Sequence, residues 1–221
     1  LPHASYDLCE EKLLTSTYTV ATVYGGLQAA ARIAEQFGYP DDAIRWQTLA
    51  DDIRDTAHEK LYNNGKKFFY KGFLLEENGM LSFDETIDVS SLFGAVVFGL
   101  YDNTDPYVLE SIKTLENTLV NYSPSKGVPR YEHDQYHTCG SQYLGNPWPV
   151  TTLWLAQLYI DQGQPEKAED AIAWAHDLML KSGILPEQIH PDTSTHLSVQ
   201  PLIWSQAEFM NTVLDLVNNK K

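Results

Sequence analysis

The segment YDLCEEK, Tyr6–Lys12, places three carboxylates close together, those of Asp7, Glu10 and Glu11. Acidic side chains that precede a helix stabilise its positively charged N-terminal end, so this cluster can be an acidic turn before the first helix. A loop carboxylate can also approach a substrate and act as a proton donor. The segment by itself leaves both interpretations open.

A further carboxylate lies in a loop near the other end of the chain. Glu187 follows a proline in LPEQ, Leu185–Gln188, ahead of a helix that contains a tryptophan. By itself it can be an exposed loop residue. Paired across a pocket, two carboxyl groups are the minimal set for glycoside hydrolysis: one protonated acid donates to the leaving oxygen, and one carboxylate activates water on the opposite face. In an inverting enzyme the two groups are ~6.5–9.5 Å apart.

A polar segment in the middle of the chain offers groups that could bind a sugar. GVPRYEHDQY, Gly127–Tyr136, is followed by GNPWP. Arg130 could hold sugar hydroxyls with its rigid fork of donors, and Trp148 could stack on a sugar ring. Alternatively, Arg130 pairs with Glu132 or Asp134 in a solvated loop. Trp148 would then belong to the core.

Other site chemistries have little support in the sequence. His133 and His137 are spaced as HxxxH but lie in a predicted loop, so we expect no metal site and no cofactor. No P-loop, GxGxxG or GxSxG occurs, which leaves phosphate, dinucleotide and acyl-serine chemistry unsupported. The only cysteines are Cys9 and Cys139, which excludes a disulfide framework and predicts thiols.

The composition limits the partners. With 43% hydrophobic and 20% charged residues the 221-residue chain is typical of a globular protein. Its net charge of −15 argues against nucleic acid and anionic membranes, which need a basic surface, and is compatible with a neutral substrate. No apolar run approaches the ~20 residues of a membrane span. No signal peptide is visible, and the sequence does not assign a compartment, although thiols slightly favour the cytoplasm.

Helices must position these segments, because helical spacing dominates the apolar pattern. The predicted helices lie at about 20–37, 41–61, 84–101, 105–121, 147–160, 166–180 and 200–217. Turn residues followed by an aromatic run predict a small strand or hairpin at about 63–73. Residues 121–146 form a polar loop that is longer than most connections, which makes it a candidate functional loop.

The predicted fold class is all-α, with about seven helices joined alternately by short turns and long polar loops. Helical hairpins packed side by side would collect the long loops at one end, where a helical barrel carries its active site. A superhelical repeat array is the alternative, but no fixed period of about 34 or 40 residues supports it. We see no domain boundary and predict a single domain over residues 1–221.

Taken together, these stretches resemble glycoside hydrolase family 15, the glucoamylase and glucodextranase family. DLCEE, Asp7–Glu11, is similar to the family's acid motif D-L-W-E-E, and YTVATVYGGLQAAARIAEQFG resembles its prokaryotic branch. VPRYEHDQY and GNPWPVTTLWLAQLYI resemble its central loop and following helix. GILPEQIHPDTSTHLSVQPLIWSQAEF resembles its general-base segment. The matches keep the family's order along essentially the whole chain.

The resemblance implies an (α/α)6 barrel. A complete barrel has twelve helices, so the chain would be the C-terminal portion of a catalytic domain. The resemblance also implies that Glu10 is the general acid and Glu187 the general base of an inverting, exo-acting enzyme that releases glucose from non-reducing ends of α-glucans. The substrate-binding positions that it implies are Asp7, Glu11, Arg130 and Trp148. The implied partners are an α-glucan and the N-terminal remainder of the barrel, with no nucleic acid and no membrane.

Departures from the family pattern keep an alternative open. Cys9 stands where the family has Trp, and prokaryotic members usually have Arg, Gly and His where this chain has Lys12, Leu14 and Ser16. The alternative is a catalytically inactive relative that binds glucan or a partner protein. The linkage also stays open between maltooligosaccharide, dextran-type glucan and trehalose.

Overall fold

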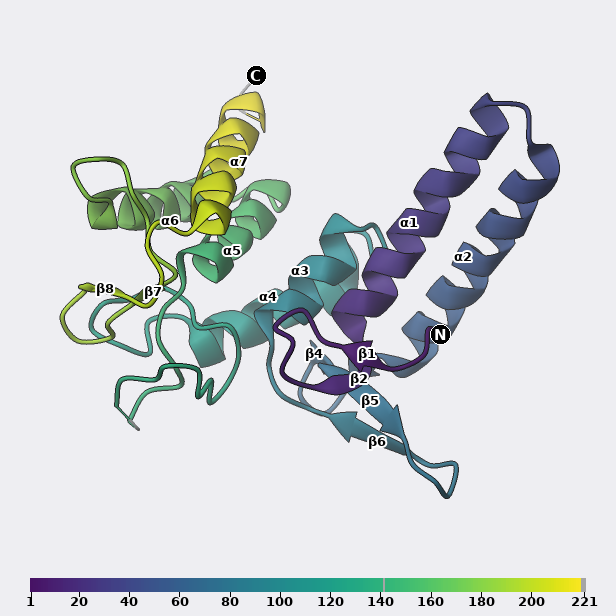
Figure 1. Cartoon of the computed structure of the whole chain (residues 1–221), viewed down its shortest axis with the longest axis horizontal. Helices are drawn as coiled ribbons and strands as arrows, with labels where there is room; N and C mark the ends of the chain where they lie inside the picture. Colours follow the sequence, from purple (N-terminus) through teal and green to yellow (C-terminus); the bar gives the residue numbers. More distant parts are fainter. Residues whose placement is uncertain (141, 220–221) are drawn as a thin grey trace. The chain divides into compact units, whose positions relative to one another are not determined.

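The structure is a computed structural model that describes residues 1–140 and 142–219. It divides the chain into two compact units, Leu1–Thr114 and Leu115–Lys221. The prediction of a mostly helical chain with about seven helices is confirmed for the described residues (Figure 1). The helices are α1 (Thr17–Gln36), α2 (Pro40–Lys60), α3 (Val89–Val97), α4 (Pro106–Leu119), α5 (Pro149–Asp161), α6 (Pro165–Leu178) and α7 (Ile203–Asn219). That the whole chain is one domain stays a prediction.

Helices α1 and α2 of the first unit form a hairpin, and α1 also packs against α3 (Figure 1). The Ser16 hydroxyl caps α1 by accepting a hydrogen bond from the Thr19 N–H at 3.0 Å. Gly38, with a φ of +80°, follows the end of this helix, where glycine is favoured. The α1–α3 contact is close, because a Cβ on Gly94 would lie 2.6 Å from the Tyr18 ring. The packed helices support the first candidate segment, Tyr6–Lys12, which precedes α1 in the chain.

A four-stranded antiparallel sheet lies beside these helices, and the sequence did not predict it. Its strands, in spatial order, are β1 (Ser5–Tyr6), β2 (Leu13–Ser16), β5 (Gly72–Leu75) and β6 (Leu81–Asp84). A separate two-stranded sheet pairs β3 (Tyr62–Asn63) with β4 (Phe68–Phe69), where the sequence predicted a small hairpin. The predicted helix at about 84–101 is wrong at its start: Asp84 pairs with Gly72 in the sheet, and Asp88 caps α3.

The second unit is built around α5, which is buried on nearly all sides. This helix packs against both α6 and α7 (Figure 1). The Trp154 ring contacts the Trp204 ring of α7, with the centroids 5.5 Å apart. Between α6 and α7 the chain forms a two-stranded sheet of β7 (Gln188–Ile189) and β8 (His196–Leu197). We call residues 179–202, between α6 and α7, the arm; it contains the second candidate segment, with Glu187.

None of the described helices is long and apolar enough to cross a membrane.

Candidate functional site

The first candidate segment is the hairpin loop between β1 and β2 of the first unit. The Asp7 N–H donates to the Lys12 carbonyl at 2.9 Å, which closes the loop, and the Glu10 N–H donates to the Asp7 carbonyl at 3.0 Å. Glu10 has a φ of +57°, a left-handed conformation that is uncommon for a non-glycine residue. The side chain of Glu10 is exposed. The loop therefore presents this carboxylate on a constrained backbone.

Asp7 is buried and binds its own loop. One carboxylate oxygen accepts hydrogen bonds from the N–H groups of Glu11 and Lys12, at 2.8 and 3.2 Å. The other oxygen lies 3.2 Å from the ammonium of Lys71. Glu11 is exposed and Cys9 is half-buried, with its thiol not in a disulfide. These contacts show that Asp7 stabilises the loop. Direct substrate binding by Asp7 or Glu11 stays a prediction.

Glu187 lies in the second unit, on the arm between α6 and α7. Its N–H donates to the Val199 carbonyl at 2.9 Å, and the Ser198 hydroxyl donates to its carboxylate. The side chain is half-buried, whereas the neighbouring Gln188 is fully buried. A carboxylate that is partly accessible and oriented by one hydroxyl can still accept a proton with its other oxygen. This arrangement suits a general base.

The central loop and the Glu187 arm lie against each other within the second unit. The Asn146 side chain donates to the Gln188 side-chain oxygen at 2.6 Å, and the Ile189 N–H donates to the Pro147 carbonyl at 2.9 Å. These bonds bring GNPWP beside LPEQ, so Trp148 and Glu187 come from adjacent segments. Both motifs are evident in the sequence, but the contact between Asn146 and Gln188 is not. The sequence signal that could have identified them is their proximity to predicted site residues, since Asn146 is close to Trp148 and Gln188 follows Glu187.

Arg130 is buried rather than solvated. Its Nε and Nη2 atoms each donate to the Asp134 carboxylate at 2.7 Å, which is a bidentate pair. Its guanidinium carbon lies 5.0 Å from the centre of the Tyr136 ring and 4.8 Å from that of Trp148. Trp148 itself is buried at the N-terminus of α5. The pairing expected in the alternative interpretation is therefore present, but in a packed aromatic setting. The roles of Arg130 and Trp148 in substrate binding stay predictions.

We expect Asp134→Asn to destabilise the protein by ~3–5 kcal/mol, because removing one partner of a buried ion pair leaves the other charge uncompensated. The side chains of Arg130 and Asp134 are 10% and 0% exposed, so water cannot replace the lost carboxylate charge. Chemical unfolding measures the effect. Asp177→Asn is the control, because Asp177 is 82% exposed. Equal stability of the two variants would contradict the prediction.

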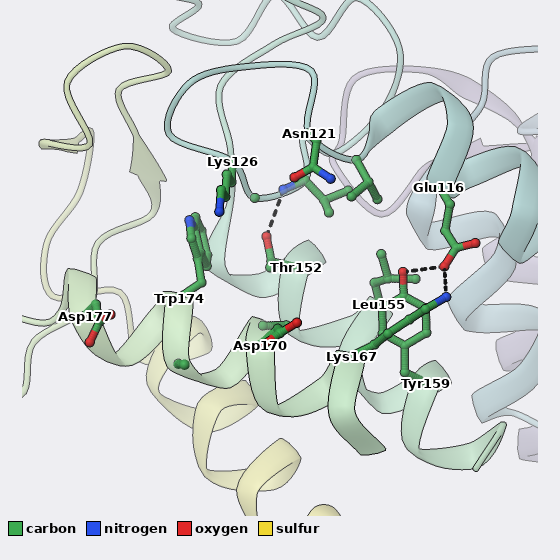
Figure 2. A pocket seen from close by; sticks show the side chains of 15 residues that line it. Glu116, Asn121, Lys126, Thr152, Leu155, Tyr159, Lys167, Asp170, Trp174 and Asp177 are labelled. Carbon is green, nitrogen blue, oxygen red and sulfur yellow. Dashed lines mark hydrogen bonds and ion pairs between the residues drawn. The ribbon is translucent and has the colours of Figure 1, made fainter. Parts of the chain in front are cut away.

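A pocket of about 730 Å³ opens elsewhere in the second unit (Figure 2). Figure 2 shows Trp174 and Lys126 on one side of it and, on the other, Glu116 joined to Lys167 and Tyr159. The Glu116 carboxylate lies 2.6 Å from the Lys167 ammonium and accepts from the Tyr159 hydroxyl at 2.9 Å. None of the residues predicted as catalytic or substrate-binding lines this pocket. It is therefore a feature separate from the candidate site.

Among residues 1–140 and 142–219, no cluster of three or more His, Cys, Asp or Glu side chains could hold a metal ion.

Comparison with known proteins places the chain among glycosidases. The family model described as glycosyl hydrolases family 15 matches residues 2–178. An uncharacterized glycosyl hydrolase of Methanocaldococcus jannaschii is 27% identical over an alignment of 218 residues, gaps included, which covers 93% of this chain and 33% of the relative. A glucoamylase of Clostridium sp. is 28% identical over an alignment of 236 residues, gaps included, which covers 95% of this chain and 33% of the relative. Trehalase 2 of Sulfolobus acidocaldarius is 21% identical over 220 residues, with 96% and 34% covered.

Solved structures show the same fold. A bacterial glucoamylase complexed with acarbose superposes with a TM-score of 0.80 at 23% identity, covering 94% of this chain and 34% of that one. A family 15 glucoamylase from Hypocrea jecorina gives a TM-score of 0.78 at 17% identity, with 98% and 44% covered. The chain thus spans about a third of the length of the first curated relatives.

Proposed function

Because the chain belongs to family 15 of the glycosyl hydrolases, we propose that it is the C-terminal portion of an (α/α)6 catalytic domain that releases glucose from non-reducing ends of α-glucans. The observation that carries the proposal is the local setting of each glutamate within its own unit. Glu10 is exposed on a constrained hairpin loop, and Glu187 is oriented by the Ser198 hydroxyl on a loop arm. Both positions suit carboxyl groups that exchange protons with a substrate or with water.

In the proposed mechanism, the protonated carboxyl of Glu10 gives its proton to the glycosidic oxygen while the bond from that oxygen to the anomeric carbon breaks. The Glu187 carboxylate takes a proton from water as the water oxygen bonds to the anomeric carbon from the opposite face. The product is β-glucose from an α-linkage. Ser198 donates to one oxygen of Glu187, which leaves the other oxygen to accept the proton.

The proposed substrate is a neutral α-linked glucose chain. The similar bacterial glucoamylase was solved with acarbose, and a similar glycosidase was solved with glucose. Trehalase 2 among the relatives makes the α,α-linked disaccharide the second substrate to test. Glucose release by the complete protein from maltose, isomaltose and trehalose, assayed in parallel, would distinguish these linkages.

A non-catalytic relative that binds glucan or a partner protein is the second candidate. The observation that favours it is Cys9, which stands in the acid motif where the family pattern has Trp. The wider aromatic surface beside the acid is then missing. A complete protein that binds maltooligosaccharides in calorimetry but releases no glucose would favour this candidate over the enzyme.

We expect the isolated 221-residue chain to hydrolyse maltose or isomaltose poorly or not at all, while the complete protein is active. Transition-state charge must be met by preorganised groups all around the sugar. The chain spans only 33% of the first two curated relatives, so much of that surrounding wall lies outside it. An enzyme-coupled glucose assay tests this. Robust glucose release by the isolated chain would refute the prediction.

A further inference from the structure

A buried ammonium lies beneath the loop that carries Glu10. The Lys71 side chain is 3% exposed, and its nitrogen lies 3.2 Å from a carboxylate oxygen of Asp7 and 2.9 Å from one of Asp88. Lysine is almost never buried to this extent unless it is paired. Burial alone would lower the pKa of Lys71, but the carboxylates of Asp88 and Asp7 outweigh burial and raise the pKa of Lys71 above its ordinary value. The group stays an ammonium.

Each of the two aspartates uses its second oxygen to hold backbone. That of Asp88 accepts from the Ser90 N–H at 2.8 Å and from the Ser90 hydroxyl at 2.6 Å, which caps α3. That of Asp7 accepts from the N–H groups of the two residues directly after Glu10. Lys71 therefore joins the start of a helix to the Glu10 loop.

The backbone of Lys71 is itself fixed in the sheet. Its N–H donates to the Asp84 carbonyl at 2.9 Å, and its carbonyl accepts from the Thr17 N–H at 3.0 Å. The backbone of Lys71 is therefore held where β5, β6 and the N-terminus of α1 meet, and its side chain extends from this fixed point. Because its backbone is fixed, the Lys71 ammonium can hold its carboxylate partners in a defined position.

From this geometry we propose that Lys71 is a positioning residue for Glu10. Lys71 orients the Asp7 carboxylate, and Asp7 fixes the loop on both sides of Glu10 through its carbonyl and its carboxylate. The left-handed backbone of Glu10 depends on these bonds. Without the ammonium, Asp7 would be a buried carboxylate with no cation facing it, and the loop would rearrange to expose or neutralise it. The inference rests on the proposed role of Glu10 as the general acid.

Kinetics of Lys71→Met in the complete protein test the proposal, with maltose and α-glucosyl fluoride as substrates. We expect kcat on maltose to fall ~10- to 100-fold with little change in KM, because a displaced catalytic group costs rate even when binding is intact. The loss on the fluoride should be much smaller, since fluoride leaves with little help from an acid. Lys71→Arg, which keeps the charge, should recover part of the activity on maltose.

Lys67→Met is the matched control. Lys67 is 61% exposed and pairs with the Glu110 carboxylate at 3.1 Å in the same unit. Exposed ion pairs contribute little, so both substrates should be turned over within about 2-fold of the wild-type rate. A leaving-group effect in Lys71→Met but not in Lys67→Met would support a positioning role, because loss of folded enzyme lowers both rates equally.

Asp88→Asn decides the matter if Lys71→Met does not fold. Asparagine keeps the capping oxygen of α3 and removes one charge that faces Lys71. We expect the same preference for the fluoride at a smaller amplitude, together with faster amide hydrogen exchange at residues 7–12. Equal losses on both substrates, or unchanged kinetics, would overturn the proposal. A wild-type protein inactive on both substrates would instead refute the proposed function.

Discussion

Glu187→Gln in the complete protein should lower kcat on maltose by at least ~10²-fold, because an amide cannot take a proton from water and general base catalysis contributes ~10²–10⁴-fold. The side-chain volume changes little. The Ser198 hydroxyl can donate to the amide oxygen as it does to the carboxylate, so the loop arm should keep its conformation. Steady-state kinetics should show the loss in kcat, and calorimetry should show that maltose still binds.

Glu166→Gln is the control for this experiment, because Glu166 is an exposed residue in the first turn of α6. Its kcat and KM should match those of the wild-type protein. Near-full activity of Glu187→Gln would show that another group activates the water. A loss of folded structure in Glu187→Gln, detected by circular dichroism, would mean that the carboxylate holds the arm.

Glu10→Gln should cause a comparable loss on maltose and a smaller loss on α-glucosyl fluoride. The amide cannot donate the proton that the sugar leaving group needs, whereas fluoride leaves with little protonation. Glu187→Gln should stay impaired on the fluoride, because water activation is still required. The left-handed backbone of Glu10 is the same for glutamine, so the substitution removes the acid and little else.

The two variants together separate acid from base. Glu77→Gln provides the control for Glu10, since Glu77 is exposed in the turn between β5 and β6 of the same unit. If Glu10→Gln and Glu187→Gln respond alike to the leaving group, the assigned roles are wrong. If only Glu187→Gln is impaired on maltose, Glu10 is not the acid and the proton comes from elsewhere.

Local sequence signals determined the helices. Apolar periodicity placed most of them within a few residues of their observed bounds. Helix formation depends mainly on neighbours in the chain, so a one-dimensional pattern contains most of the information. The start of the helix predicted from about residue 84 was wrong, because strand pairing between β5 and β6 depends on residues that the pattern does not connect.

The candidate glutamates were also found from sequence, because they lie in motifs whose residues are consecutive. The contacts around the predicted site residues could not be found from the sequence. Lys71 follows an aromatic run and gives no sign of burial, yet the fold encloses its ammonium between Asp7 and Asp88. Arg130 was a candidate sugar ligand, and only the fold shows that its Nε and Nη2 atoms pair with Asp134 and that its guanidinium lies beside Tyr136 and Trp148.

The sequence by itself therefore determined the helical class, the loops that carry Glu10 and Glu187, and the likeness to a glycosidase family. The tertiary structure alone decided which charges are buried, which partners neutralise them and how the Glu10 loop is held. The physical reason is that a buried charge is stable only beside a partner that the fold supplies, often from a distant part of the chain. Local spacing cannot specify that partner, as Lys71 with Asp7 and Asp88 illustrates.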